Sequence, residues 1–248
     1  MSDLLTLPTR RDEAWRYSKL EALEGVWPVA APEALTLDAG ESRAITIVQD
    51  AGDDAVIVRD HQIVLQAGSR LDVAVLNIGG TLGRVSFDVT LHKGAHFELA
   101  GAQIGGGEQT LEIVTVVRHI EPEATSNQVV RTVLAGHATG NMLGKVEVAR
   151  DAQLTDASQS VKAMLLDRTA TANSKPELEI YADDVKCAHG ATVGELDKAA
   201  LFYCASRGIP PHVAQTILLH AFVAEVFEGV EGGEAMLEAA LKKLEQLG

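Results

Sequence analysis

The chain has 248 residues, of which 46% are hydrophobic and only 4% aromatic, so aliphatic side chains must fill most of a sizeable core. Its formal net charge of −14 argues against nucleic-acid binding, which needs a basic surface. Two cysteines, a charged N-terminus and no apolar run of about 18 residues argue against a disulfide framework, a signal peptide and a membrane span, so we expect a cytoplasmic protein.

The first 41 residues are interpreted as a short helical or extended segment. Trp15, Leu20 and Leu23 have roughly helical spacing there. The pattern changes over residues 42–190, which contain short alternating or β-branched segments separated by Gly, Asp and Asn turns. Such segments predict a mainly β core.

A weak repeat runs through these predicted strands. Its units align at intervals of 26, 28, 29 and 24 residues, at Leu71, Phe97, Thr125, Leu154 and Leu178. A period of this length suits one coil of a β-solenoid with three short strands per turn, whose narrow interior needs few aromatic side chains. Strands and turns alone also permit a sandwich or a jelly roll, but the repeat favours the solenoid.

The hydrophobic period becomes helical after residue 190, which predicts a C-terminal helical domain over residues 191–248. Thr192 and Glu195 have capping-box spacing at its start, and the "GIPP" segment supplies a proline for the first turn of a second helix. A last helix is expected from about Glu234 to Leu247. The faces that we expect these two helices to bury are formed by Ala214, Ile217, Leu218 and Ala221 and by Leu237, Leu241 and Leu244.

Motifs of nucleotide and hydrolase chemistry are absent from the sequence. The nearest approach to a P-loop, residues 136–147, has its glycines one residue too close and Val146 where Ser or Thr must reach magnesium. Gly105–Gly107 lies between strand-like segments, which indicates a loop. No Gly-x-Ser-x-Gly, His-Glu-x-x-His or Cys-x-x-Cys pattern is present. We therefore expect no ATP hydrolysis by this chain.

Cys187 and His189 form the candidate site. In an extended segment, Val185, Cys187 and His189 share one face, and Lys186 lies on the other. A thiolate beside an imidazole suits iron, zinc or an iron–sulfur cluster, and a nearby Lys186 would lower the pKa of the thiol. Two ligands do not complete a four-ligand site, so Cys204 or a second chain would have to contribute. A Cys-x-His pair is also common by chance.

The other histidines and the second cysteine have a plainer interpretation. His92 and His96 flank a turn and are expected at the surface, at the corner of a coil. His212 and His220 lie on the predicted second helix, in solvated or satisfied positions. Cys204 lies among apolar helix positions, where a buried free cysteine is common, so we expect it to be structural.

Two segments resemble one protein family. The segment Pro176–Ile209, "PELEIYADDVKCAHGATVGELDKAALFYCASRGI", closely resembles the C-terminal signature of SufD, a scaffold subunit of the SUF iron–sulfur cluster assembly machinery. The segment "EAWRYSKL" is similar to the family's Glu-x-Trp-Arg/Lys-Tyr-Thr/Ser-x-Leu segment. Both positions of the family's KCxHG motif, Cys187 and His189, are intact, whereas Cys204 resembles the SufB version of its segment.

The resemblance implies a right-handed parallel β-helix core with helical ends and a non-catalytic role. It implies a heterodimer with SufB, a paralogous subunit that pairs through its β-helix end, and docking of the ATPase SufC on the C-terminal helices. In this family the histidine corresponding to His189 is implicated in forming a cluster with a SufB cysteine. The resemblance therefore implies a transient cluster at the junction and no cofactor in the isolated chain, which we expect to be able to homodimerise through the same end.

Two other classes of function stay open at this point. A β-helix polysaccharide-active enzyme would use Asp183 and Asp184 as acid and base or as calcium ligands, although both are also typical of a turn. Such an enzyme usually carries aromatic sugar platforms, in which this chain is poor. A stand-alone zinc or iron protein would need more ligands than the sequence offers around Cys187.

Overall fold

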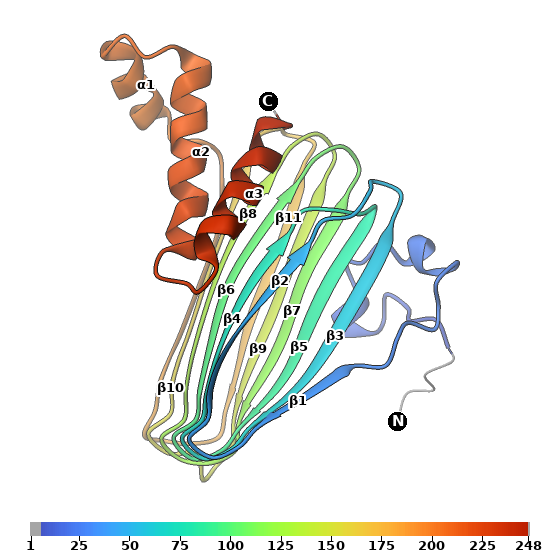
Figure 1. Ribbon diagram of the computed structural model, residues 1–248, viewed down its shortest axis with the longest axis vertical. Coiled ribbons are helices and arrows are strands. Elements are labelled where there is room, and N and C mark those ends of the chain that lie inside the picture. Colours follow the sequence, from blue (N-terminus) through green and yellow to red (C-terminus); the bar gives the residue numbers. More distant parts are fainter. Residues whose placement is uncertain (1–5, 248) are drawn as a thin grey trace.

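The computed structural model describes residues 6–247, and its core is a parallel β-solenoid of two facing sheets (Figure 1). Strands alternate between the sheets, so each coil contributes one strand to each. The odd sheet has the order β1-β3-β5-β7-β9-β11, and the even sheet has the order β12-β10-β8-β6-β4-β2. The strands are β1 Glu33–Leu37, β2 Ser42–Gln49, β3 Val56–Leu65, β4 Arg70–Asn77, β5 Leu82–Leu91, β6 His96–Gly105, β7 Thr110–His119, β8 Thr125–Leu134, β9 Thr139–Val148, β10 Asp156–Leu165, β11 Thr171–Ile180 and β12 Lys186–Gly194.

The predicted solenoid is confirmed, but the predicted three short strands per coil are wrong. Each coil has two strands, most of them 10 residues long. The first predicted interval is correct, since Leu71 is in register with Phe97. Phe97 is then in register with Ser126 rather than with Thr125. The later coils contain more residues than the first, so no single repeat length describes all of them.

The last two predicted repeat positions do not lie in the expected row. The strand residue in register with Ser126 is Ala157 and not the predicted Leu154. Leu154 belongs to the turn before β10, where its φ is 61°. Leu178 lies in the other sheet, in register with Val146. Alternating apolar residues occur in both sheets, so the pattern alone did not separate a strand of one sheet from a strand of the other.

The β core extends beyond both ends of the expected range. β1 begins at Glu33 and pairs with β3, before residue 42, and β12 continues past residue 190. The predicted capping box is therefore wrong, because Thr192 lies within β12. The helix α1 begins instead after Asp197, whose side chain accepts a hydrogen bond from the backbone N–H of Ala199. Residues 1–5 and 248, at the ends of the expected first and last segments, lie outside the described residues.

The interior of the solenoid is narrow and mainly aliphatic, as its composition predicts. Its core cluster combines Leu, Val and Ile side chains from both sheets with only two aromatic residues, Phe87 and Phe97. The two sheets approach closely at Gly101, where an added Cβ would lie 3.0 Å from Cδ1 of Ile113. Small residues are required at such positions because close-packed interiors do not absorb extra volume.

Three C-terminal helices lie on the side of the even sheet: α2 and α3 cover its outer face, and α1 projects away from it (Figure 1). They are α1 Lys198–Ser206, α2 Pro211–Phe227 and α3 Gly233–Glu245, and Pro211 occupies the first turn of α2 as predicted. The predicted buried face of α2 is only partly correct: Ala214 is buried, but Ile217 and Ala221 are exposed. Leu219 and Val223 pack against the sheet instead. α2 is apolar on nearly all sides, and periodicity did not identify the side that contacts the sheet. No helix among residues 6–247 is long and apolar enough to cross a membrane.

The N-terminal segment packs on the outer face of the odd sheet. It forms two 3₁₀ turns, Glu13–Trp15 and Leu20–Leu23, rather than the predicted single short helix. Ser18 Oγ donates a hydrogen bond to the buried carboxylate of Glu112 at 2.6 Å. Arg84 Nη1 also donates to that carboxylate, at 2.6 Å, and its guanidinium lies 3.8 Å from the ring centre of Trp15. A buried polar cluster thus attaches this segment to β5 and β7.

Removing the carboxylate of this cluster should destabilise the fold strongly. Glu112→Ala leaves the guanidinium of Arg84 buried without its partner, which typically costs about 3–5 kcal/mol. We expect that loss in the free energy of unfolding measured by urea denaturation. The matched control is Glu177→Ala, which removes an exposed carboxylate from Lys175 and should cost below about 1 kcal/mol. Equal losses in the two variants would contradict the role of the buried pair.

Candidate functional site

Cys187 and His189 lie on β12, at the open C-terminal end of the solenoid. β12 pairs with β10 on one side, and within residues 6–247 no strand pairs with its other side. β11 is the corresponding edge of the odd sheet. The end of the solenoid therefore presents two strand edges and the side chains between them.

The two motif side chains share one face of β12, as alternation predicted, and that face points into the interior. Cys187 is in register with the buried Ala157, and His189 is in register with the buried Gln159. Lys186 lies on the opposite face. Cys187 is half-buried and packs against a small cluster that includes Leu178 of the facing sheet, whereas His189 is exposed. The thiol thus has a packing role and the imidazole is accessible.

The thiol of Cys187 is not activated in this structure. Burial raises its pKa above the ordinary cysteine value, and the nearby carboxylate of Asp156 raises the pKa further. A backbone hydrogen bond at Ala157 lowers the pKa; this influence is smaller than that of burial but larger than that of Asp156. The expectation that Lys186 lowers this pKa is wrong, because the lysine lies on the outer face of the strand.

The raised pKa of Cys187 predicts slow alkylation. Thiolate is the reactive form, so the rate of alkylation by iodoacetamide should rise with pH through a midpoint above about 8.5, the value for an ordinary cysteine. The measurement needs the Cys204→Ser variant, in which Cys187 is the sole cysteine. A midpoint at or below the ordinary value would contradict this environment.

Metal ligands are sparse around the pair. Among residues 6–247 there is no group of three or more His, Cys, Asp or Glu side chains placed to hold a metal ion. Cys204 therefore does not join Cys187 and His189; it lies half-buried in α1. The pair offers one imidazole and one thiol at an edge, and no further ligand accompanies them in the described part of the chain.

His92 and His96 are held by neighbouring carboxylates. His92 Nδ1 lies 3.1 Å from Glu121 Oε1, and His96 Nε2 lies 3.2 Å from Glu98 Oε2, at the corner of a coil as predicted. Sequence reasoning assigned no role to His119, which is fully buried; burial lowers its pKa to about 4. The sequence offered one signal of this burial: His119 follows the apolar Val117 by two residues on a strand, so the two side chains share a face.

Asp183 and Asp184 form the turn between β11 and β12. The backbone N–H of Asp184 donates to Gln153 Oε1 at 2.9 Å, and its carbonyl accepts from the backbone N–H of Leu154 at 2.7 Å. Both aspartates are exposed at this corner. Their contacts are those of a turn that stacks on the preceding coil.

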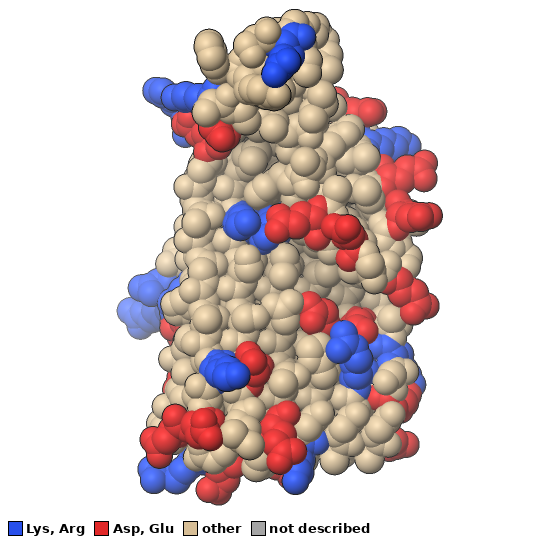
Figure 2. Space-filling view, turned by 90° about the vertical axis from the view of Figure 1, so that its left-hand side faces the viewer, with Lys and Arg blue, Asp and Glu red and all other residues tan. Residues whose placement is uncertain are grey.

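An exposed apolar surface lies on the projecting end of the helical domain. α1 has no buried residue and stands away from the solenoid (Figure 1). Phe202 is 77% exposed and Tyr203 60% exposed, and Val213 and Ile217 of α2 are also exposed. We call these four residues the apolar platform. Figure 2 views this side of the molecule, where uncharged residues cover much of the projecting end. Exposed aromatic groups of this kind are typical of binding surfaces.

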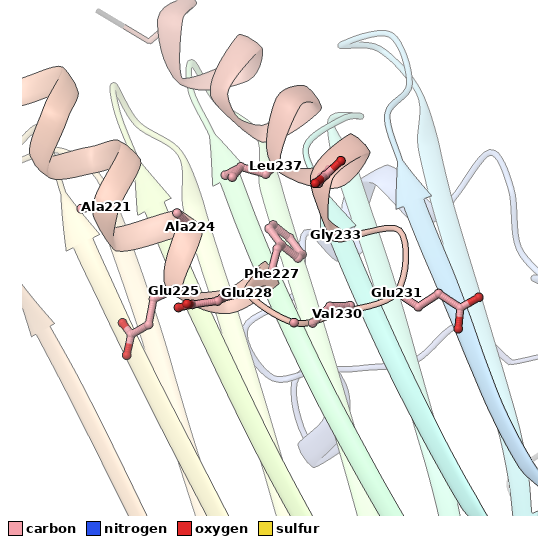
Figure 3. Close-up of a pocket in the computed structure, with 11 residues that line it drawn as sticks. Ala221, Ala224, Glu225, Phe227, Glu228, Val230, Glu231, Gly233 and Leu237 are labelled. Carbon is pink, nitrogen blue, oxygen red and sulfur yellow. The ribbon is translucent and has the colours of Figure 1, made fainter.

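A cavity of about 780 Å³ lies beside the connection between α2 and α3 (Figure 3). Phe227 and Leu237 line it together with several carboxylates. One of these, Glu225, is held by the buried guanidinium of Arg131 at 3.1 Å. The cavity lies on the outer side of the even sheet, whereas Cys187 and His189 face the interior, so the two places are separate.

Comparison with known proteins places this architecture in context. Residues 33–222 match the family model described as SUF system FeS cluster assembly, SufBD core domain. The chain is 31% identical to an iron–sulfur cluster assembly SufBD family protein of Synechocystis sp. over 77% of this chain and 43% of that protein. It is 37% identical to the chloroplastic protein ABCI7 of Arabidopsis thaliana over 66% of this chain and 35% of that protein. It is 36% identical to the iron–sulfur cluster assembly protein SufD of Escherichia coli over 53% of this chain and 31% of that protein. The chain thus spans less than half the length of each of these relatives.

Proposed function

The chain belongs to the SufBD family of SUF iron–sulfur cluster assembly proteins, and from this premise we propose that it is a SufD-type scaffold subunit. In this role it pairs with SufB, docks the ATPase SufC and holds His189 at the nascent cluster, and it catalyses no reaction alone. It works in the cytoplasm, where free thiols stay reduced. The observation that carries the proposal is the placement of Cys187 and His189 on the interior face of β12, an edge strand that pairs only with β10 within residues 6–247.

The open end supports pairing with a second solenoid. The unpaired N–H and C=O groups of β12 can continue the even sheet into another β-solenoid, as strand addition does in many complexes. Such pairing would surround His189 with groups of the partner. The missing ligands of a transient cluster would then come from SufB. A second copy of this chain can satisfy the same edge in the absence of SufB, which gives a homodimer.

The apolar platform supports docking of the ATPase. Phe202 and Tyr203 offer large rigid surfaces with few internal degrees of freedom, and such residues dominate binding energy in many interfaces. The segment nearest to a P-loop lies largely in β9, where no phosphate-binding loop is formed. An ATP-driven process that uses this chain therefore needs a separate nucleotide-binding subunit.

Co-expression with SufB and SufC from the same genome tests the proposal. Native mass spectrometry of the purified material should detect a complex that contains all three chains, and light scattering should detect homodimers of the isolated chain that SufB dissociates. A chain that purifies without SufB and SufC, under conditions in which those two subunits bind each other, would contradict the proposed function.

A further inference from the structure

One interior row of the even sheet changes its chemistry toward the open end. The first three strands contribute aliphatic side chains to this row, the next two contribute amides and β12 contributes the imidazole. The row consists of Ile45, Val73, Leu99, Gln128, Gln159 and His189. Two interior rows flank this one, and the row two residues later on each strand has no polar side chain, so the solenoid does not require amides at its end. The residues of that adjacent row are Ile47, Val75, Gly101, Val130, Val161 and Ala191.

The two buried amides in this row have unused hydrogen-bonding groups: both groups of Gln159 and the Nε2 of Gln128 have no partner among the described residues. Gln159 is 3% exposed, and neither its Oε1 nor its Nε2 has a partner among the described residues. Gln128 Oε1 accepts a hydrogen bond from Thr115 Oγ1 at 2.7 Å, but Gln128 Nε2 also lacks a partner. A buried polar group without a partner costs about 1–3 kcal/mol, which leucine would avoid at these positions. Native proteins keep few such groups, and each calls for a reason.

The facing sheet leaves room for the Gln159 amide. Gly144 lies opposite it on β9, and an added Cβ there would lie 2.7 Å from Gln159 Nε2. The same Cβ would lie 3.3 Å from Thr115 Oγ1. A glycine thus creates space within an otherwise close-packed interior, directly beside the coil that carries His189.

We propose that Gln159 is a positioning residue for His189. Its Oε1 accepts the N–H of the ring nitrogen that turns toward the interior, which leaves the lone pair of the other ring nitrogen free at the open end. Neighbouring strands lie about 4.8 Å apart, so the two side chains are within reach of each other. The exposed ring reaches the amide by rotation about its side-chain bonds, which is fast for exposed residues.

The chemical reason lies in how imidazole binds metals. A metal-binding histidine almost always donates its second N–H to an acceptor, and this bond fixes the tautomer and the direction of the ring. Gln159 supplies that acceptor from within this chain, so His189 is prepared before a partner arrives. The value of this preparation for cluster assembly rests on the proposed function, whereas the contact between the two side chains does not.

NMR of the isolated chain labelled with ¹⁵N-histidine tests the contact directly. At a pH where the ring is neutral, the two ring nitrogens of His189 should report one dominant tautomer in the wild type. Gln159→Leu should give a mixture of tautomers, and Gln159→Glu should restore one tautomer because a carboxylate also accepts the N–H. Gln159→Met, close in shape to glutamine, replaces Gln159→Leu if the leucine variant does not fold.

The matched control is Gln103→Leu. Gln103 is equally buried, but its amide is already paired with Thr132 Oγ1 and with the carbonyl of Asn141. This variant should lose stability and keep the His189 tautomer. In the complex with SufB and SufC, Gln159→Leu should slow cluster formation by about 10–100-fold, as loss of a metal ligand's hydrogen-bond partner typically does.

These measurements test the contact between Gln159 and His189 separately from the role of His189 in cluster assembly. A folded Gln159 variant with the wild-type tautomer of His189 overturns the positioning role, whatever the complex does. A mixture of His189 tautomers in the folded Gln159→Leu variant supports the contact between Gln159 and His189. If clusters then form at the normal rate in both Gln159→Leu and His189→Ala complexes, the contact stands and the proposed function of His189 fails.

Discussion

His189→Ala should nearly abolish cluster formation in a complex reconstituted from this chain, SufB and SufC, and the complex itself should still assemble. The ring of His189 is exposed, so its removal should change the free energy of unfolding by no more than about 0.5 kcal/mol. The variant loses an imidazole at the junction, where a cluster needs nitrogen or sulfur ligands. Absorbance of the nascent cluster and the melting temperature of the complex measure the two effects separately.

Two further variants give this experiment its controls. His212→Ala removes another exposed histidine, on α2, and should leave cluster formation unchanged. Cys187→Ala removes a half-buried thiol and should lower the melting temperature; it should match His189→Ala in cluster formation only if the thiol is also a ligand. Full cluster assembly by the His189→Ala complex would overturn the site.

Phe202→Asp should weaken binding of SufC by about 30-fold or more. An exposed aromatic residue at the centre of an interface typically contributes at least about 2 kcal/mol, and each 1.4 kcal/mol corresponds to a factor of about ten. The substitution also places a charge on the apolar platform. Phe202 packs against no core residue, so the circular dichroism and melting temperature of the chain should not change. Titration calorimetry with purified SufC measures the affinity.

A matched control uses an exposed aromatic residue elsewhere. Tyr181 is 60% exposed, like Tyr203, but lies in the turn that precedes β12, and Tyr181→Ala should bind SufC normally. Point substitutions are preferable to deletion of residues 210–248, because α2 and α3 cover apolar side chains of β4 and β6 such as Leu76 and Ile104. Unchanged affinity of Phe202→Asp would show that SufC docks elsewhere.

The parts of the fold that follow from local alternation were predictable from the sequence. Cys187 and His189 share the interior face of a strand because side chains two residues apart point the same way. The solenoid followed from the spacing of turns and strands. The segment around these two residues also carried the resemblance to the SufD family, which the SufBD core domain match supports at the level of the SufBD family.

Features that depend on tertiary contacts were not predictable in the same way. The number of strands per coil depends on which turns close a coil, and the unequal coils hid the register of Leu154 and Leu178. The buried face of α2 depends on where the even sheet lies, because apolar residues surround that helix. The amide of Gln159 looked like any polar residue of a strand until its register with His189 placed it inside the open end.

Hydrogen–deuterium exchange of the chain with and without SufB tests most directly whether the open end is the junction. Addition of SufB should slow exchange of the β12 amides, which lie at an unpaired edge, and should leave the amides of β1 and β2 at the opposite end unchanged. Protection of β1 and β2 with unchanged exchange in β12 would place SufB at the end of the solenoid opposite His189 and would contradict a cluster site there.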